Sequence, residues 1–222
     1  EVAFPTGHEQ WAGRLPRDQE YVARSLDTDT VAFLGVKSNV PTNPLSVDLL
    51  SPGTTSVQVS PNAWELGKNF TADVAVLGDL RQVLSSMADL AASAVDDAMR
   101  SDRLAEATRT PDTGGLDVER SNPEDAPERT VTDLATALNR AAPDVRVVGE
   151  APTSLSAVTD AYDFEPGDYF AARGGGLGYG LPAAVGSAVA ETHRVDPRDV
   201  VAFIGDGSYL YYPHALYSAA RE

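Results

Sequence analysis

Residues 200–208 read Val-Val-Ala-Phe-Ile-Gly-Asp-Gly-Ser. The first five are an uninterrupted apolar run, which is typical of a strand in the centre of a parallel sheet, where both faces are covered. Ligands of open α/β sheets bind at the carboxyl ends of the strands. There, Asp206 can hold a hard cation through oxygen, and the flanking glycines let a phosphate approach the backbone closely. The alternative is a plain strand-to-turn junction in which Asp206 caps the next helix.

A second glycine-rich segment lies upstream, with five glycines in residues 174–180. It leads into a predicted helix over 182–191, whose Pro182 fits the first turn. Glycines permit close backbone approach, and a helix N-terminus favours anions. The alternative is a flexible surface loop, although glycines that only connect two elements carry a high entropic cost. The loop is not a dinucleotide fingerprint, because it follows no clear strand. One helix and one strand join it to the Gly-Asp-Gly-Ser turn, so both loops can reach one ligand.

Short apolar strands alternate with amphipathic helices along most of the chain, which predicts an α/β fold with parallel sheets flanked by helices. Thr130 followed by Asp133 is typical of a helix N-terminus. Residues 101–129 are rich in proline, glycine and charge, which predicts a linker. Strands are predicted over 31–35, 55–59, 73–77, 144–148 and 200–204, and helices over 18–26, 79–99, 130–142, 153–161 and 182–191. The predicted domains are 1–100 and 130–222.

Length and residue types exclude several classes of protein. The 222 residues are enough for one or two domains with a sizeable core. There are no cysteines, so disulfides, Cys-ligated zinc, iron–sulfur clusters and thiol catalysis are excluded. No apolar run approaches the roughly 20 residues that span a bilayer, which excludes a transmembrane helix. No signal peptide pattern is visible at the N-terminus, so a cytoplasmic location is expected.

The chain is strongly acidic, with 33 acidic against 17 basic residues and a net charge of −16. Such a surface repels nucleic acid and anionic membranes, so neither is expected as a partner. The only lysines are Lys37 and Lys68. An acidic excess with arginine favoured over lysine resembles the proteins of salt-loving organisms, and molar salt would screen the self-repulsion. The alternative is an ordinary acidic protein. In both cases the charge concerns solubility rather than function.

Four segments together resemble the thiamine-diphosphate-dependent 2-oxoacid decarboxylase and acetolactate synthase family. The glycine loop with its following helix start (174–186) and the Gly-Asp-Gly-Ser turn (205–208) both match that family's diphosphate-binding domain. Residues 4–8, Phe-Pro-Thr-Gly-His, are similar to a Phe-Pro-Thr-x-His motif of the benzoylformate decarboxylase branch. Residues 150–154, Glu-x-x-Thr-Ser, resemble the loop near the cofactor diphosphate. The resemblance implies a middle domain (1–100), a linker (101–129) and a thiamine-diphosphate-binding domain (130–222), the last truncated at its C-terminus.

The resemblance also implies a role for each matched residue. Asp206 would ligate the Mg²⁺ that bridges to the cofactor diphosphate. His8 would transfer protons near the substrate, a role that histidine side chains commonly perform. The residues expected to contact thiamine diphosphate are Thr153, Ser154, Gly175, Gly176, Leu177, Gly205, Gly207 and Ser208. The backbone of Gly175 and Leu177 would contact the aminopyrimidine, and the Leu177 side chain would support the bent cofactor. Pro152 and Arg173 depart from the family's residue types.

The implied activity is the thiamine-diphosphate- and Mg²⁺-dependent, non-oxidative decarboxylation of a small 2-oxoacid. One alternative is an acetolactate-synthase-like carboligase, although no clear signature of the flavin that such enzymes often bind is present. Another is a non-catalytic segment for cofactor binding and dimerisation. Family active sites form between subunits, so a homodimer or homotetramer is expected. The sequence matches neither the family's pyrimidine-binding domain nor the asparagine that completes its magnesium site. We therefore expect part of a longer enzyme, inactive alone.

Overall fold

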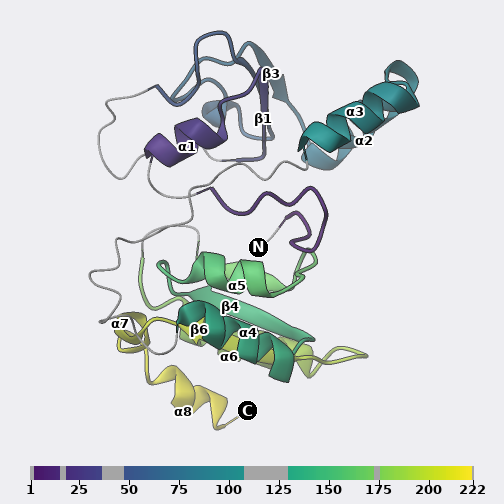
Figure 1. Ribbon diagram of the computed structural model, residues 1–222. Coiled ribbons are helices and arrows are strands. Elements are labelled where there is room, and N and C mark those ends of the chain that lie inside the picture. The colour runs from purple at the N-terminus through teal and green to yellow at the C-terminus, as the bar shows by residue number, and fades with distance from the viewer. Residues whose placement is uncertain (1–2, 16–18, 37–47, 108–129, 173–175, 222) are drawn as a thin grey trace, which may run out of the picture. The chain divides into compact units, whose positions relative to one another are not determined.

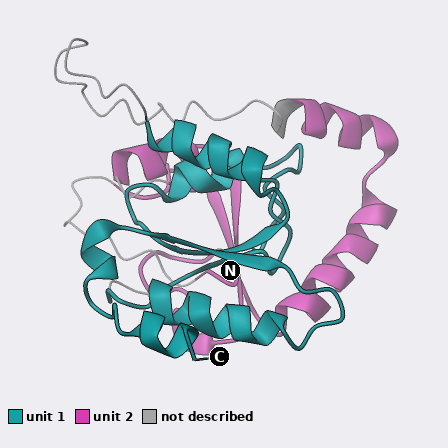
Figure 2. Ribbon diagram, turned by 90° about the horizontal axis from the view of Figure 1, so that it is seen from below, with its two compact units in different colours: residues 1–13, 120–222 teal, residues 14–119 magenta. Residues whose placement is uncertain are grey.

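The computed structural model of the chain describes residues 3–15, 19–36, 48–107, 130–172 and 176–221 (Figure 1). They form parallel sheets flanked by helices, which confirms the predicted fold class. The chain divides into two compact units (Figure 2). Unit 2 comprises residues 14–119, whereas unit 1 combines residues 1–13 with residues 120–222. The N-terminal segment, which we expected in the domain 1–100, therefore lies with the C-terminal part of the chain.

Unit 2 is built on a three-stranded parallel sheet in the order β1-β2-β3. Its interior includes Val22, Val31 and Val59, all buried. The Asp79 carboxylate accepts a hydrogen bond from the Gln82 N–H at 3.1 Å and so caps helix α2. The elements are α1 (Gln19–Ser25), β1 (Thr30–Leu34), β2 (Thr55–Ser60), a 3-10 turn η1 (Ala63–Glu65), β3 (Val74–Leu77), α2 (Leu80–Ala94) and α3 (Asp97–Ala107).

The long helix predicted over 79–99 is wrong, because two helices occupy this region. Helix α2 ends where Val95 adopts an extended conformation, with φ −113° and ψ 119°. The Asp96 carboxylate then accepts a hydrogen bond from the Met99 N–H at 2.7 Å, which begins α3. Helix α3 runs to Ala107, so the segment predicted as a linker starts with helix. Residues 108–129 lie outside the described residues.

Unit 1 holds a second parallel sheet, in the order β5-β4-β6. The Thr130 and Asp133 side chains form the expected capping box at the start of α4. Its elements are α4 (Val131–Ala141), β4 (Val145–Glu150), α5 (Leu155–Ala161), β5 (Tyr169–Ala171), α6 (Gly180–Glu191), β6 (Asp199–Ile204), α7 (Asp206–Tyr209) and α8 (Ala215–Ala219). The strand β5 was not predicted, because three residues carry too little periodicity to identify one.

The central strand of the unit 1 sheet presents opposite faces to different helices. Val145 and Val147 of β4 pack with the buried side chains of α4 and α5 in the main hydrophobic cluster. The alternate residues, Arg146 and Glu150, contact α6 on the other face. The order of strands also corrects a prediction. We expected residues 200–204 in the centre of the sheet, but within the described residues β6 pairs only with β4 and forms an edge.

Shortening a side chain in the centre of this sheet tests the described core. Val147 is fully buried on β4. We expect Val147→Ala to lower the free energy of unfolding by about 2 kcal/mol, through lost apolar burial and the remaining cavity. Val195→Ala removes the same atoms from a fully exposed side chain. It should change the free energy of unfolding by less than about 0.5 kcal/mol. Denaturant unfolding measures both, and equal effects would contradict the described packing.

The N-terminal segment is attached to unit 1 through Thr6. Its hydroxyl donates to the carbonyl oxygen of Tyr162 at 2.5 Å and accepts from the Phe164 N–H at 2.7 Å. The Thr6 N–H donates in turn to the Phe164 carbonyl oxygen at 3.0 Å. At Gly7 an added Cβ would lie 2.9 Å from the Asp163 carboxyl carbon. The Thr-Gly pair of the Phe-Pro-Thr-Gly-His motif is thus explained by packing.

Candidate functional site

Three loops meet at the carboxyl edge of the unit 1 sheet, the edge at which β4 and β6 end. Glu150 is the last residue of β4 and pairs in register with Ile204, the last residue of β6. The Gly205 N–H donates to the Glu150 carbonyl oxygen at 3.1 Å. The third loop leads from β5 into α6, and the side chain of Glu150 contacts it. This edge is where open α/β sheets bind ligands.

The Glu150 carboxylate fixes the glycine loop to the end of β4. Its Oε1 accepts a hydrogen bond from the Gly178 N–H, and its Oε2 one from the Gly180 N–H, both at 2.5 Å. The residue is 5% exposed. Sequence analysis placed Glu150 in a family-like motif but gave it no contact. The available signal was an acidic residue at the end of an otherwise largely apolar strand.

The glycine loop differs from the sequence-based expectation in two ways. It follows a strand, β5, although we predicted none there. The anion at the N-terminus of α6 is the chain's own Glu150 carboxylate, so these amides are already occupied. Gly176 and Leu177 are exposed, Leu177 at 42%. Gly175, and Arg173 beside it, lie outside the described residues.

The Gly-Asp-Gly-Ser turn begins a short helix at the same edge. Gly205 is the N-cap of α7 and Asp206 its first residue, so Asp206 is not a side-chain cap. The Asp206 side chain is exposed, and Ser208 is buried. The N–H groups of Asp206, Gly207 and Ser208 have no acceptor within the helix, because a helix leaves its first N–H groups unbonded. The Asp206 carboxylate thus lies beside N–H groups that the helix itself leaves unbonded.

Thr153 and Ser154 lie on the connection that leaves β4 at this edge. Thr153 is exposed, and Ser154 is half-buried. Ser154 is the N-cap of α5, yet its hydroxyl makes no capping hydrogen bond. Both hydroxyls belong to the carboxyl edge by their place in the chain. The structure therefore brings Thr153, Ser154, Gly176, Leu177, Gly205, Asp206, Gly207 and Ser208 to the loops of one sheet edge.

The donor set at this edge fits a hydrated cation shared with a phosphate. Within the described ranges, no cluster of three or more His, Asp or Glu side chains could hold a metal by itself. Mg²⁺ is usually bound through one or two carboxylates together with phosphate oxygens and water. The exposed Asp206 carboxylate fits that pattern. An added Cβ at Gly176 or Gly207 would meet no atom of the chain within 4 Å. Packing among these residues therefore does not require glycine at either position, whereas a closely approaching ligand would.

His8 is not part of this group of loops. It is exposed, and its Nδ1 accepts a hydrogen bond from the Gln10 N–H at 3.1 Å. Its ring meets Phe4 edge to face, with centroids 5.0 Å apart. Across the part of the chain that the structure describes, no hydrogen bond, ion pair or ring contact joins His8 to Asp206. Its proposed role in proton transfer stays a prediction.

An ionic network centred on the buried Glu191 lies at the opposite, amino edge of the unit 1 sheet. Glu191, the last residue of α6, is 5% exposed and accepts from the Arg146 Nε and from the Arg198 N–H, the latter at 2.9 Å. Arg198 also donates to Asp168 at 2.5 Å and to Asp144 at 3.1 Å. The network joins α6, β4 and the start of β6. Sequence analysis did not identify it, because its members are far apart in the chain.

The Glu191 carboxylate should make stability depend on acid. The hydrogen bond from the Arg198 N–H, with further contributions from Arg146 and Arg194, lowers its pKa below the ordinary value of 4.5. A carboxylate whose pKa is lower in the folded state than in the unfolded state stabilises the fold at pH values above the unfolded-state pKa. This stabilisation disappears as the pH falls toward the folded-state pKa. We therefore expect Glu191→Gln to reduce the free energy of unfolding near pH 7, with a smaller difference from wild type below about pH 4. Urea unfolding between pH 3 and pH 7 measures this, and a constant difference would contradict it.

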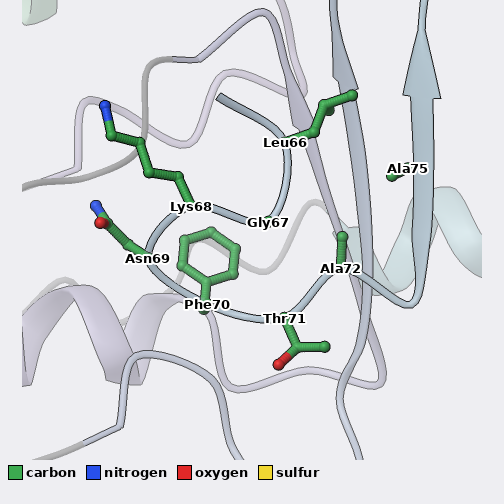
Figure 3. Close-up of a pocket in the computed structure, with 8 residues that line it drawn as sticks. All are labelled: Leu66, Gly67, Lys68, Asn69, Phe70, Thr71, Ala72 and Ala75. Carbon is green, nitrogen blue, oxygen red and sulfur yellow. The ribbon is translucent and has the colours of Figure 1, made fainter. Parts of the chain in front are cut away.

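Unit 2 contains a separate open pocket of about 500 Å³ (Figure 3). It is formed by the connection between β2 and β3. None of the sequence-predicted site residues lines it, and its lining residues are Leu66, Gly67, Lys68, Asn69, Phe70, Thr71, Ala72 and Ala75. No helix among the described ranges is both long and apolar enough to cross a membrane.

Comparison with known proteins identifies the domain that carries the carboxyl edge. Residues 148–222 match the family described as "Thiamine pyrophosphate enzyme, C-terminal TPP binding domain". They belong to that family. The matched part of the TPP-binding domain runs from β4 to the end of the chain, so it includes Glu150, the glycine loop and the Gly-Asp-Gly-Ser turn.

The chain is homologous to benzoylformate decarboxylase and acetolactate synthase. It is 32% identical over 220 residues to a benzoylformate decarboxylase from Pseudomonas aeruginosa, covering 98% of this chain and 38% of the relative. It is 25% identical over 212 residues to an acetolactate synthase large subunit from Lactococcus lactis, covering 93% and 35%. The TPP-binding domain thus belongs to a chain that spans less than two fifths of these relatives.

A solved structure gives the same result for the fold. An X-ray structure of an enzyme from Mycobacterium smegmatis, whose thiamin diphosphate dependence is itself inferred, superposes with a TM-score of 0.72 at 27% identity. The similarity covers 98% of this chain and 40% of that chain. The α/β fold of this chain is therefore shared with part of a larger protein.

Proposed function

We propose that unit 1 binds thiamine diphosphate with Mg²⁺ at its carboxyl edge, as part of an enzyme that decarboxylates a 2-oxoacid without oxidation. The observation that carries this proposal is the exposed Asp206 carboxylate beside the first N–H groups of α7, in a domain of the TPP-binding family. The family supplies the cofactor class, and the geometry supplies a set of donors at the place where it would bind. The 32% identical benzoylformate decarboxylase favours decarboxylation.

Each group at the edge has a defined role in this proposal. The Asp206 carboxylate would hold Mg²⁺, whose charge would offset that of the cofactor diphosphate. The N–H groups of Gly207 and Ser208 donate to the diphosphate, as do the hydroxyls of Thr153 and Ser154. The bound cofactor supplies the nucleophilic carbon and the electron sink that loss of CO₂ from a 2-oxoacid requires. The Leu177 side chain is exposed beside the loop and supplies an apolar surface against the cofactor.

Two further parts of the proposal concern His8 and assembly. The free Nε2 of His8 is the atom that would exchange a proton with the substrate, because Nδ1 is engaged by the Gln10 N–H. His8 would then act in an active site that a neighbouring subunit or the rest of the enzyme completes. We propose a homodimer or homotetramer, and sedimentation of the protein measures its state.

Calorimetric titration of the chain with thiamine diphosphate, with and without Mg²⁺ in molar salt, tests the proposal. We expect binding that requires Mg²⁺, because the diphosphate and Asp206 repel each other without a cation between them. A chain that is folded by circular dichroism but binds no thiamine diphosphate in either condition would contradict it. Binding of equal strength with and without Mg²⁺ would contradict only the proposed role of Asp206 and not the binding of the cofactor.

The second candidate is an acetolactate-synthase-like carboligase. The similarity to the Lactococcus lactis subunit, which covers 93% of this chain, favours it. The two candidates differ in what they release. The longer enzyme should release an aldehyde and CO₂ from benzoylformate if it is a decarboxylase, and should form acetolactate from pyruvate if it is a carboligase. A flavin absorbance spectrum of the purified protein would further favour the carboligase.

A further inference from the structure

We propose that Glu150 is a positioning residue of the carboxyl edge: its carboxylate holds the Gly178 and Gly180 amides and thereby sets the conformation of the described part of the glycine loop, residues 176–180. The loop then presents Gly176 and Leu177, which are exposed, to the ligand. The link to a cofactor rests on the proposed function above. The effect on the loop itself does not depend on it.

The hydrogen bonds of Glu150 reach two of the three loops at the edge, and Glu150 itself ends the strand that leads into the third. Its two carboxylate oxygens accept from Gly178 and Gly180, one each, at 2.5 Å. Its carbonyl oxygen accepts from the Gly205 N–H at 3.1 Å. Glu150 itself ends β4, so one residue joins the end of the central strand, the glycine loop and the start of the Gly-Asp-Gly-Ser turn. A change in its side chain is therefore transmitted directly to the glycine loop.

A carboxylate at this position suits helix α6. Gly180 is the first residue of α6, so its N–H has no intrahelical acceptor, and Gly180 is buried. The N-terminus of this 12-residue helix carries a partial positive charge, which favours an anion. On the same face of β4, Arg146 contacts Glu191 at the other end of α6. The central strand thus contacts both ends of α6 through charged side chains.

The space around Glu150 explains why its partner is glycine. An added Cβ at Gly180 would lie 2.8 Å from the Glu150 Cβ and 2.9 Å from its Oε2. The Gly178 backbone has a φ of +94°, a conformation that favours glycine. The loop conformation therefore needs both glycines and the carboxylate between them. Because their amides are occupied, Gly178 and Gly180 bind no phosphate, which leaves that task to the α7 turn.

Amide hydrogen exchange of the wild-type chain, followed by NMR without any cofactor, tests the loop contact directly. We expect the Gly178 and Gly180 amides to exchange at least about tenfold more slowly than the Gly176 amide, because a hydrogen-bonded, buried amide is protected. The intrahelical bonds of α6 cannot protect Gly180, so its protection reports on the Glu150 contact together with the burial of the amide. Exchange of both amides as fast as that of Gly176 would overturn the proposal, whether or not the chain binds thiamine diphosphate.

Two matched substitutions separate positioning from stability. Glu150→Gln keeps the shape of the side chain but replaces one acceptor by a donor, so one loop amide loses its partner. Glu191→Gln makes the same change at the opposite edge of the sheet, in a glutamate that is also 5% exposed. We expect both variants to melt at lower temperatures. Only Glu150→Gln should speed exchange at Gly178 or Gly180 and raise the Kd for thiamine diphosphate with Mg²⁺ about tenfold.

Unchanged loop exchange in a folded Glu150→Gln variant overturns the proposal, as does a loss of affinity that Glu191→Gln shares in full. If Glu150→Gln does not fold, the wild-type exchange measurement decides. If the wild-type chain binds no thiamine diphosphate, the proposed function fails, and the exchange of the loop amides alone supports or overturns the positioning role.

Discussion

Asp206→Ala should strongly weaken the Mg²⁺-dependent binding of thiamine diphosphate. The exposed carboxylate at the start of α7 is the proposed metal ligand at this edge. Without it, only the diphosphate and water would hold the cation. Residues that merely support a metal ligand contribute about 10- to 100-fold to metal affinity. Loss of the ligand itself should therefore weaken binding by about a hundredfold or more, with little effect on folding because the side chain is exposed.

Asp196→Ala is the matched control for this prediction. Asp196 is also exposed in unit 1, and its removal changes the net charge by the same amount. It precedes β6 at the amino end of the strand, so affinity should stay within about twofold of wild type. Calorimetric titration at fixed Mg²⁺ measures all three proteins. Equal losses in both variants would show a general charge effect and contradict a ligand role for Asp206.

Gly178→Ala should destabilise unit 1 more than its small size suggests. The backbone at Gly178 has a φ of +94°, where an L side chain costs about 1–2 kcal/mol. The added Cβ would also overlap the Tyr212 ring and lie 2.9 Å from the Tyr211 Cβ. Overpacking typically costs another 1–3 kcal/mol. We expect the free energy of unfolding to fall by about 3 kcal/mol.

Gly176→Ala is the control within the same loop. An added Cβ at Gly176 meets no chain atom within 4 Å, so we expect a change of less than about 0.5 kcal/mol. Denaturant unfolding of both variants, in the absence of cofactor, measures the difference. If Gly176→Ala were as damaging as Gly178→Ala, the loop would not have the described conformation.

Sequence patterns predicted the parts of the fold that depend on neighbours along the chain. Short apolar runs indicated most of the strands, because the period of a strand is visible within five or six residues. The Thr130–Asp133 capping box and Pro182 in the first turn of α6 were also predicted, because each depends on residues within one turn of the helix. The pattern failed at Val95 and Asp96, because these two residues, with Val95 extended, separate α2 from α3. The three-residue strand β5 was too short to show a period.

The candidate site shows the same division. Asp206 was identified from the sequence alone, because a strand followed by Gly-Asp-Gly-Ser is a local signal, and the structure places it at the carboxyl edge of the sheet. The contact of Glu150 with Gly178 and Gly180 was not predictable, since it joins residues 28 and 30 positions apart. The glycine loop consequently binds the chain's own carboxylate rather than offering α6 to an external anion.

The sequence by itself determined the α/β class, the parallel arrangement and the acidic turn at the end of β6. These follow from composition, period and turn residues, each of which acts within a few positions. Only the tertiary structure decided that β4 is the central strand, that residues 3–13 pack with unit 1, and that Glu150 and Glu191 occupy opposite ends of α6. Such contacts depend on which distant segments pair, because buried hydrogen-bonding groups must find partners wherever the folded chain brings them.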